Sequence, residues 1–77
     1  MKIEYKYIRF ELIECKPKTD VYAIRNINSL VIIGYISWNR AWRQYCFDTQ
    51  AGMTFSASCL NDISDFIKQL MDKRNLV

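Results

Sequence analysis

The chain has 77 residues, 51% of them hydrophobic and 25% charged, and its 11 basic and eight acidic residues give a net charge of +3. A chain this short buries only about 60–65% of its unfolded surface, so we expect a single domain over residues 1–77 with a small core, and the composition excludes a disordered chain. Histidine is absent and the cysteines, Cys15, Cys46 and Cys59, lie far apart, which excludes the usual metal and redox motifs.

The first half of the chain predicts strands, because β-branched and aromatic residues alternate between short turn signals. The expected strands cover residues 2–15, 21–26, 30–38 and 43–48. Within the first, Ile3, Tyr5 and Tyr7 share one face, whereas Ile8 and the apolar residues after it take the other. This change of phase indicates a bulge or a strand packed on both faces.

A turn over residues 39–42 would join the last two strands as a hairpin. With that loop, Trp38 lies opposite Arg43, Ile36 opposite Tyr45, and Gly34 opposite Phe47. An aromatic ring can cover a strand glycine, and a guanidinium can stack on an indole for about 0.5–2 kcal/mol. This register therefore places an arginine beside the first tryptophan.

The last part of the chain predicts a helix over residues 57–73, because its apolar residues recur at helical spacing: Leu60, Ile63, Ile67, Leu70 and Met71. Ser56 or Ser58 can cap its first turn. Such an amphipathic helix must bury its apolar stripe against the sheet. We therefore expect an α+β fold, an antiparallel sheet of three to four strands with one C-terminal amphipathic helix packed on one face.

Catalytic chemistry is not indicated anywhere in the chain. A serine or cysteine nucleophile would lack its usual histidine base, and no glycine-rich phosphate loop is present. Glu11 and Glu14 point to opposite faces of a strand, and Cys46 and Cys59 have the character of small buried residues. The sequence predicts a protein that is not an enzyme and needs no metal or cofactor.

The hairpin carries the residues that we expect to bind a partner: Arg25, Trp38, Arg40, Trp42, Arg43 and Tyr45. Aromatic rings interleaved with arginines suit nucleic acid, since rings stack on bases and guanidinium groups hold phosphates. The same residues suit a protein partner, because tryptophan, tyrosine and arginine dominate interface hot spots. In a third interpretation both indoles simply close a small core.

The third predicted strand is apolar on both faces, although a single helix covers only one face of a small sheet. The second face would be covered by the N-terminal strand, by a second copy of the chain or by another partner. A homodimer through this second sheet face is one prediction. The longest apolar run is too short to span a bilayer and the cysteine count is odd, so we expect a cytoplasmic protein with no membrane partner.

Two spaced patterns carry a family resemblance, and they consist of Gly34, Ile36, Trp38, Trp42, Arg43, Tyr45 and Phe47, followed by Cys59, Leu60, Asp62, Ile63, Phe66 and Ile67. With them the chain resembles, from residue 19 to residue 70, a group of short uncharacterised proteins common in bacteriophages and prophages. Asp48 departs from the pattern, since those proteins tend to carry proline there. The resemblance implies a mobile-element origin and the sheet-plus-helix fold, and it implies no activity.

Two functions follow as hypotheses. The first is a non-enzymatic phage or mobile-element accessory protein that binds a host protein as an inhibitor or modulator, in the host cytoplasm, because a few rigid aromatic anchors lose little entropy on binding. The alternative is a small nucleic-acid- or nucleotide-binding module that uses the basic and aromatic hairpin. The absence of acidic residues from Val21 to Phe47 agrees with this alternative.

Overall fold

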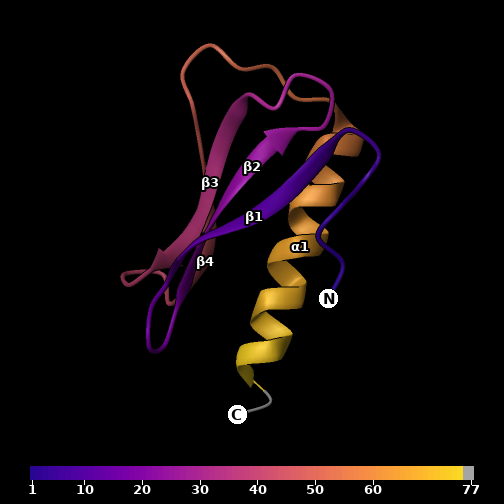
Figure 1. Ribbon diagram of the computed structural model, residues 1–77. Helices are drawn as coiled ribbons and strands as arrows, with labels where there is room; N and C mark the ends of the chain where they lie inside the picture. Colours follow the sequence, from indigo (N-terminus) through magenta and orange to yellow (C-terminus); the bar gives the residue numbers. More distant parts are fainter. Residues whose placement is uncertain (76–77) are drawn as a thin grey trace.

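The computed structural model describes residues 1–75 and confirms the α+β fold, with a four-stranded antiparallel sheet and one C-terminal helix. The strands stand in chain order across the sheet, and α1 runs along one face of it (Figure 1). The elements are β1 (Ile8–Cys15), β2 (Asp20–Asn26), β3 (Ile32–Asn39), β4 (Gln44–Thr49) and α1 (Ala57–Asn75).

The first strand begins at Ile8 rather than at residue 2, because the chain reverses direction just before it. The Tyr5 N–H donates to the Ile8 carbonyl at 2.9 Å, and the Phe10 N–H donates to the Ile3 carbonyl at 2.8 Å. The change of phase in the sequence therefore marks a reversal, and the register irregularity of β1 lies further on, between Leu12 and Glu14. The N-terminal residues consequently lie beside β1 instead of extending it.

A polar network attaches this N-terminal segment to the helix. The Tyr5 hydroxyl donates to Asp65 Oδ2 at 2.6 Å and accepts from Gln69 Nε2 at 2.8 Å. The Gln69 side chain also pairs with the backbone of Lys2. Burial, followed by the bond to the Asp65 carboxylate, raises the pKa of the Tyr5 phenol well above its usual value. The phenol is therefore held in its neutral, hydrogen-bonding form.

The core is centred on Phe66, which is fully buried. Its ring stacks on Phe10 with centroids 3.9 Å apart, and Tyr22 meets it edge-on at 4.9 Å. Phe66 lies at the middle of the buried helix face, whereas the predicted stripe placed it on the flank; Leu60, included in that stripe, is 48% exposed. The Cys59 N–H donates to Ser56 Oγ at 3.3 Å, so Ser56 is the residue that caps the helix.

The β3–β4 register differs from the predicted one by two residues. Trp38 pairs with Tyr45, Ile36 with Phe47, and Gly34 with Thr49. The difference arises in the turn, where Arg43 has a φ of 56° and its N–H donates to the Asn39 carbonyl at 2.7 Å. Arg43 therefore belongs to the turn, and β4 begins one residue later than expected.

The sheet face that α1 leaves open is partly covered by the side chains of the sheet itself. Ala23 is fully buried on the row that Glu11 and Tyr35 share with it, and Arg25 forms an ion pair with Glu11 at 3.0 Å. The homodimer through this face stays a prediction. Among the residues that the structure describes, no helix combines the length and the apolar character that crossing a membrane requires.

Candidate functional site

The structure separates the six residues that the sequence grouped as a binding site. Arg25 lies at the opposite end of the sheet from the β3–β4 turn, where it contacts Glu11 and donates to the Leu30 carbonyl at 3.0 Å. Tyr45 is buried in the core and Trp38 is half-buried against it. Only Arg40, Trp42 and Arg43 lie exposed together, in the turn itself.

Trp38 is held in place from two sides. Tyr45 meets its ring edge-on, with centroids 5.4 Å apart, and the Tyr45 hydroxyl accepts from the Asp20 N–H at 3.2 Å. The guanidinium of Arg74 lies 4.0 Å from the centroid of the indole. The expected arginine on this indole is therefore present, but it comes from the last turn of α1 and not from Arg43.

Arg74 is a candidate site residue that the sequence analysis did not identify. In the last turn of α1 its positive charge complements the helix dipole. In the structure its Nη1 also donates to the backbone carbonyl of Lys18 at 2.9 Å, which ties the end of α1 to the β1–β2 turn. One side chain thus joins the helix, the first hairpin turn and the indole of the second hairpin.

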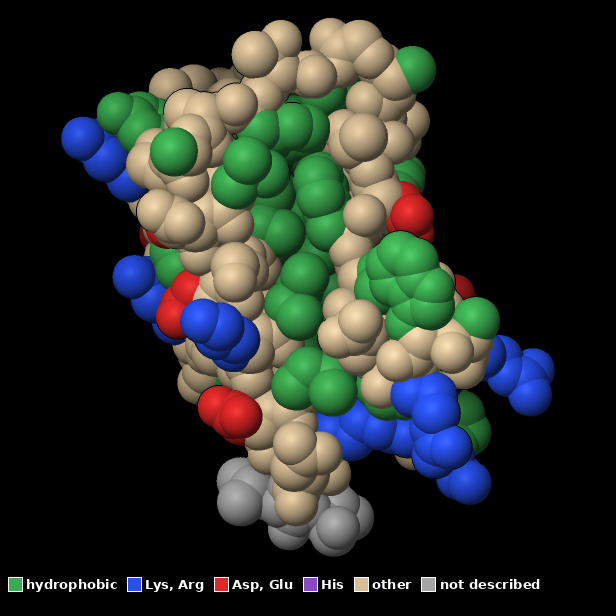
Figure 2. Space-filling view, turned by 180° about the vertical axis from the view of Figure 1, so that it is seen from behind, with side chains coloured by type: hydrophobic (Ala, Val, Ile, Leu, Met, Phe, Trp, Pro, Cys, Tyr) green, Lys and Arg blue, Asp and Glu red, His purple; other side chains and the backbone are tan. Residues whose placement is uncertain are grey.

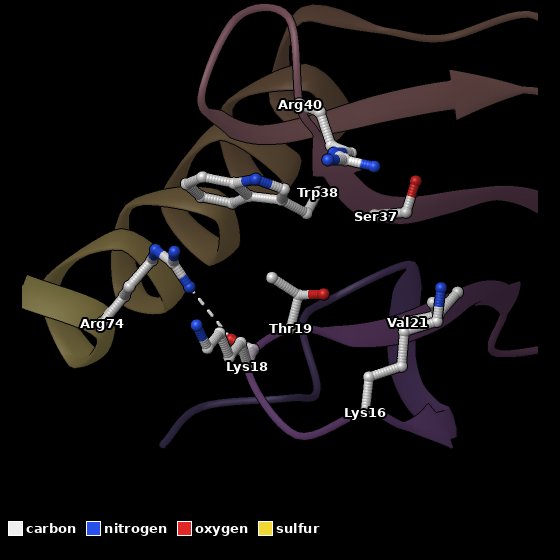
Figure 3. Close-up of a pocket in the computed structure, with 8 residues that line it drawn as sticks. All are labelled: Lys16, Lys18, Thr19, Val21, Ser37, Trp38, Arg40 and Arg74. Atoms are coloured by element: carbon white, nitrogen blue, oxygen red, sulfur yellow. Dashed lines mark hydrogen bonds between the residues drawn. The ribbon is translucent and has the colours of Figure 1, made fainter.

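These contacts border a hollow of about 360 Å³ between the two hairpin turns. In Figure 3, β3 and its turn form one wall, the β1–β2 turn forms the other, and Arg74 reaches across from α1. Four of the eight lining residues are basic and none is acidic; the set is Lys16, Lys18, Thr19, Val21, Ser37, Trp38, Arg40 and Arg74. Two hydroxyl groups, those of Thr19 and Ser37, add neutral hydrogen-bond donors.

A second, larger hollow of about 620 Å³ shares Lys18 and Arg74 with the first. It is more mixed in character, since Asp20 lies on its wall beside Lys73, with apolar surface from Leu70 and Tyr45. The negative charge of Asp20 makes this hollow less attractive to anions than the first. The Lys18–Arg74 pair forms the boundary between the two.

We call the cationic region around these hollows the basic end, and it comprises Lys16, Lys18, Arg40, Arg43, Lys73 and Arg74. Within residues 1–75, the single ion pair closer than 4.0 Å is that of Arg25 and Glu11, so no described carboxylate neutralises the basic end at contact distance. On the face seen in Figure 2, a group of Lys and Arg side chains lies at the lower right, while others lie along the left side. Uncompensated positive charge of this kind attracts anionic partners.

Trp42 projects from the same end of the molecule and is 68% exposed. Its backbone N–H donates to Asn39 Oδ1 at 2.9 Å, which fixes the turn that carries it, and exposed arginines lie on both sides of it in the chain. An indole held on a rigid turn loses little conformational entropy when it stacks on a ligand. The site therefore combines an open aromatic surface with nearby cations.

Sequence comparisons connect the chain with a phage protein. It is 31% identical over 70 residues to an uncharacterized 9.3 kDa protein of Acholeplasma phage L2, and the match covers 90% of both chains. No family model matches the chain, and no solved structure shows a significant match.

Proposed function

The chain belongs to the same family as the uncharacterized 9.3 kDa protein of Acholeplasma phage L2, and from this premise we propose that it is a non-enzymatic phage accessory protein whose basic end binds single-stranded nucleic acid. It would act in the cytoplasm of the host cell, where such strands arise. The observation that carries the proposal is a cluster of six basic side chains beside an exposed indole, with no carboxylate of residues 1–75 in contact with them.

The exposed indole favours a single strand over a duplex. Trp42 can stack on a base only when the face of that base is free, and in a duplex both faces are covered by neighbouring pairs. The cations around it, from both hairpin turns and from α1, supply the charge that follows a phosphate backbone. Rings and cations together provide sequence-tolerant binding without base-specific contacts.

An electrophoretic shift assay with random single- and double-stranded probes at low salt tests this proposal. We expect a shift with the single strand, and a Trp42→Ala variant weakened about fivefold or more, since stacking contributes about 1–3 kcal/mol per base. Val31→Ala is the matched control, because Val31 is 50% exposed and lies at the opposite end of the sheet. Absence of any shift at low salt would remove the proposal.

Salt dependence gives an independent measure. If all six cations of the basic end neutralise phosphates, the slope of log affinity against log salt is about −4, at about −0.7 per phosphate of a single strand. Affinity should then fall by about two and a half orders of magnitude between about 50 and 200 mM salt. A flat salt dependence contradicts an electrostatic contact with the strand.

The second candidate partner is a host protein, which the apolar surface favours. Figure 2 shows a band of apolar side chains along one side of the molecule, and partly buried apolar residues pack against the core in α1, in β4 and in the segment between them: Phe47, Phe55, Ile67 and Met71. With Trp42 as an anchor, this surface could hold an inhibited or redirected host factor. A pull-down from host lysate tests it, and identical bound sets for Trp42→Ala and the unaltered protein would exclude the tryptophan as the anchor.

A further inference from the structure

We propose that the 360 Å³ hollow between the two hairpin turns is a specific site for the phosphate group of a nucleotide. The inference rests on the proposed function and adds to it, because it assigns one defined phosphate position instead of a diffuse cationic surface. Ring stacking on Trp42 and phosphate binding in the hollow then become two separable contributions.

Arg74 is held in position for this role before any ligand binds. Its guanidinium lies over the Trp38 ring at 4.0 Å, and its Nη1 donates to the Lys18 carbonyl at 2.9 Å. A guanidinium has five N–H groups, so this single hydrogen bond leaves others to face a ligand. An arginine fixed in this way binds a phosphate without first losing the freedom of its side chain.

The other walls of the hollow have the chemistry that a phosphate requires. Lys16, Lys18 and the Thr19 hydroxyl come from the β1–β2 turn, whereas Arg40 and the Ser37 hydroxyl come from the β3–β4 turn and from β3 (Figure 3). The four cations that line the hollow repel one another, and a bound anion would relieve that repulsion. A volume of about 360 Å³ lies at the lower end of the range of small-molecule sites, about 300–1,000 Å³, so there is room for a phosphate with its attached sugar.

Titration of the isotope-labelled full chain, followed by backbone and indole N–H signals in NMR spectra, tests the site. The ligands are adenosine monophosphate, adenosine and inorganic phosphate. We expect adenosine monophosphate to cause saturable shifts at Thr19, Ser37 and Trp38, and adenosine to cause none there. Inorganic phosphate that reproduces these shifts at equal affinity would identify the free anion as the ligand, whereas weaker binding would identify the nucleotide.

Variants connect the shifts to the hollow. Arg74→Gln should weaken binding of adenosine monophosphate about tenfold, which is the loss of one charge-assisted hydrogen bond. Because Arg74 also joins the helix to a turn, Lys16→Gln with Arg40→Gln provides a second variant whose two side chains are exposed and free of that structural role. Lys6→Gln, at the opposite end of the sheet, is the control with the same charge change as Arg74→Gln.

The outcomes separate this inference from the proposed function. If oligonucleotides bind while the shifts stay confined to Trp42 and Arg43, which lie outside the lining of the hollow, the nucleic-acid proposal stands and the hollow is excluded as a phosphate site. Non-saturating shifts spread over all basic residues, Lys6 included, would also exclude a phosphate site in the hollow, because they indicate non-specific counterion binding. Binding of the mononucleotide without binding of oligonucleotides would keep the hollow and remove the single-strand proposal.

Discussion

Replacement of Gly34 by alanine should destabilise the fold, because the new methyl group has no room. A Cβ at this position would lie 2.5 Å from Cε1 of Phe47 and 2.7 Å from the backbone carbonyl oxygen of Asp48. Overpacking of this kind lowers the free energy of unfolding by about 1–3 kcal/mol. The lower conformational entropy of the unfolded alanine variant raises it by only about 0.4–1 kcal/mol. We expect Gly34→Ala to lower the free energy of unfolding by about 0.5–2 kcal/mol.

Urea denaturation followed by tryptophan fluorescence measures this change. For a small domain with a slope of about 1 kcal/mol per molar urea, the midpoint should move down by about 0.5–2 M. That is a substantial part of the total stability, which for a chain of this size is about 4–12 kcal/mol at 0.05–0.15 kcal/mol per residue.

A double-mutant cycle then shows how much of this cost comes from the contact with the Phe47 ring. Phe47→Leu removes the ring that the methyl group meets, but it leaves the Asp48 carbonyl in place. The double variant should therefore lose less stability than the sum of the two single variants, by about 0.5–1 kcal/mol, with a residual cost from the backbone contact. Strict additivity, or a Gly34→Ala variant more stable than the parent, would refute the packing derived from this register.

The remaining predictions concern the core, the tyrosine network and the oligomeric state. Leu70→Ala should cost about 2–4 kcal/mol of unfolding free energy, whereas the exposed control Lys68→Ala should change it little. Because folding raises the pKa of Tyr5, the contribution of its neutral phenol to the free energy of unfolding is complete below the unfolded tyrosine pKa near 10 and declines as the pH rises above that value. In denaturation series at increasing pH, a Tyr5→Phe variant should show less of this alkaline decline. Size-exclusion chromatography with light scattering at micromolar concentration should show a homodimer, and a monomer at every concentration would contradict that prediction.

The sequence pattern predicted the elements whose conformation depends on residues close together in the chain. The helix follows from its apolar period, and the strands from their β-branched and aromatic residues. The pattern could not show that the chain reverses before Ile8, because a reversal and a bulge shift the phase of a strand in the same way. Nor could it fix the β3–β4 register, which depends on the left-handed backbone of Arg43, a residue with no special preference for that conformation.

The sequence predicted the candidate site only in part, because it does not show how each tryptophan is placed relative to the turn. The two tryptophans stand four residues apart and share a hairpin, so the sequence grouped them. Trp38, however, lies on the strand and on its core-facing side, whereas Trp42 lies in the turn, where no side of the chain is covered. The same residue type therefore has opposite environments at the two positions. The position of each tryptophan relative to the turn decides which indole is available to a partner.

The basic hollow forms because α1 and β3 have nearly the same length, and no sequence motif specifies it. The helix of 19 residues is about 28 Å long at 1.5 Å per residue, and the eight residues of β3 extend about 26 Å at 3.3 Å per residue. Because α1 starts near the end of the sheet where β4 finishes, a helix of this length must end at the hairpin turns, which Arg74 contacts through Lys18. The cations that complement the helix dipole at its C-terminus therefore arrive beside the cations of the turns. A helix one turn shorter would end about 5 Å earlier, and Arg74 could no longer reach both the indole and the carbonyl of Lys18.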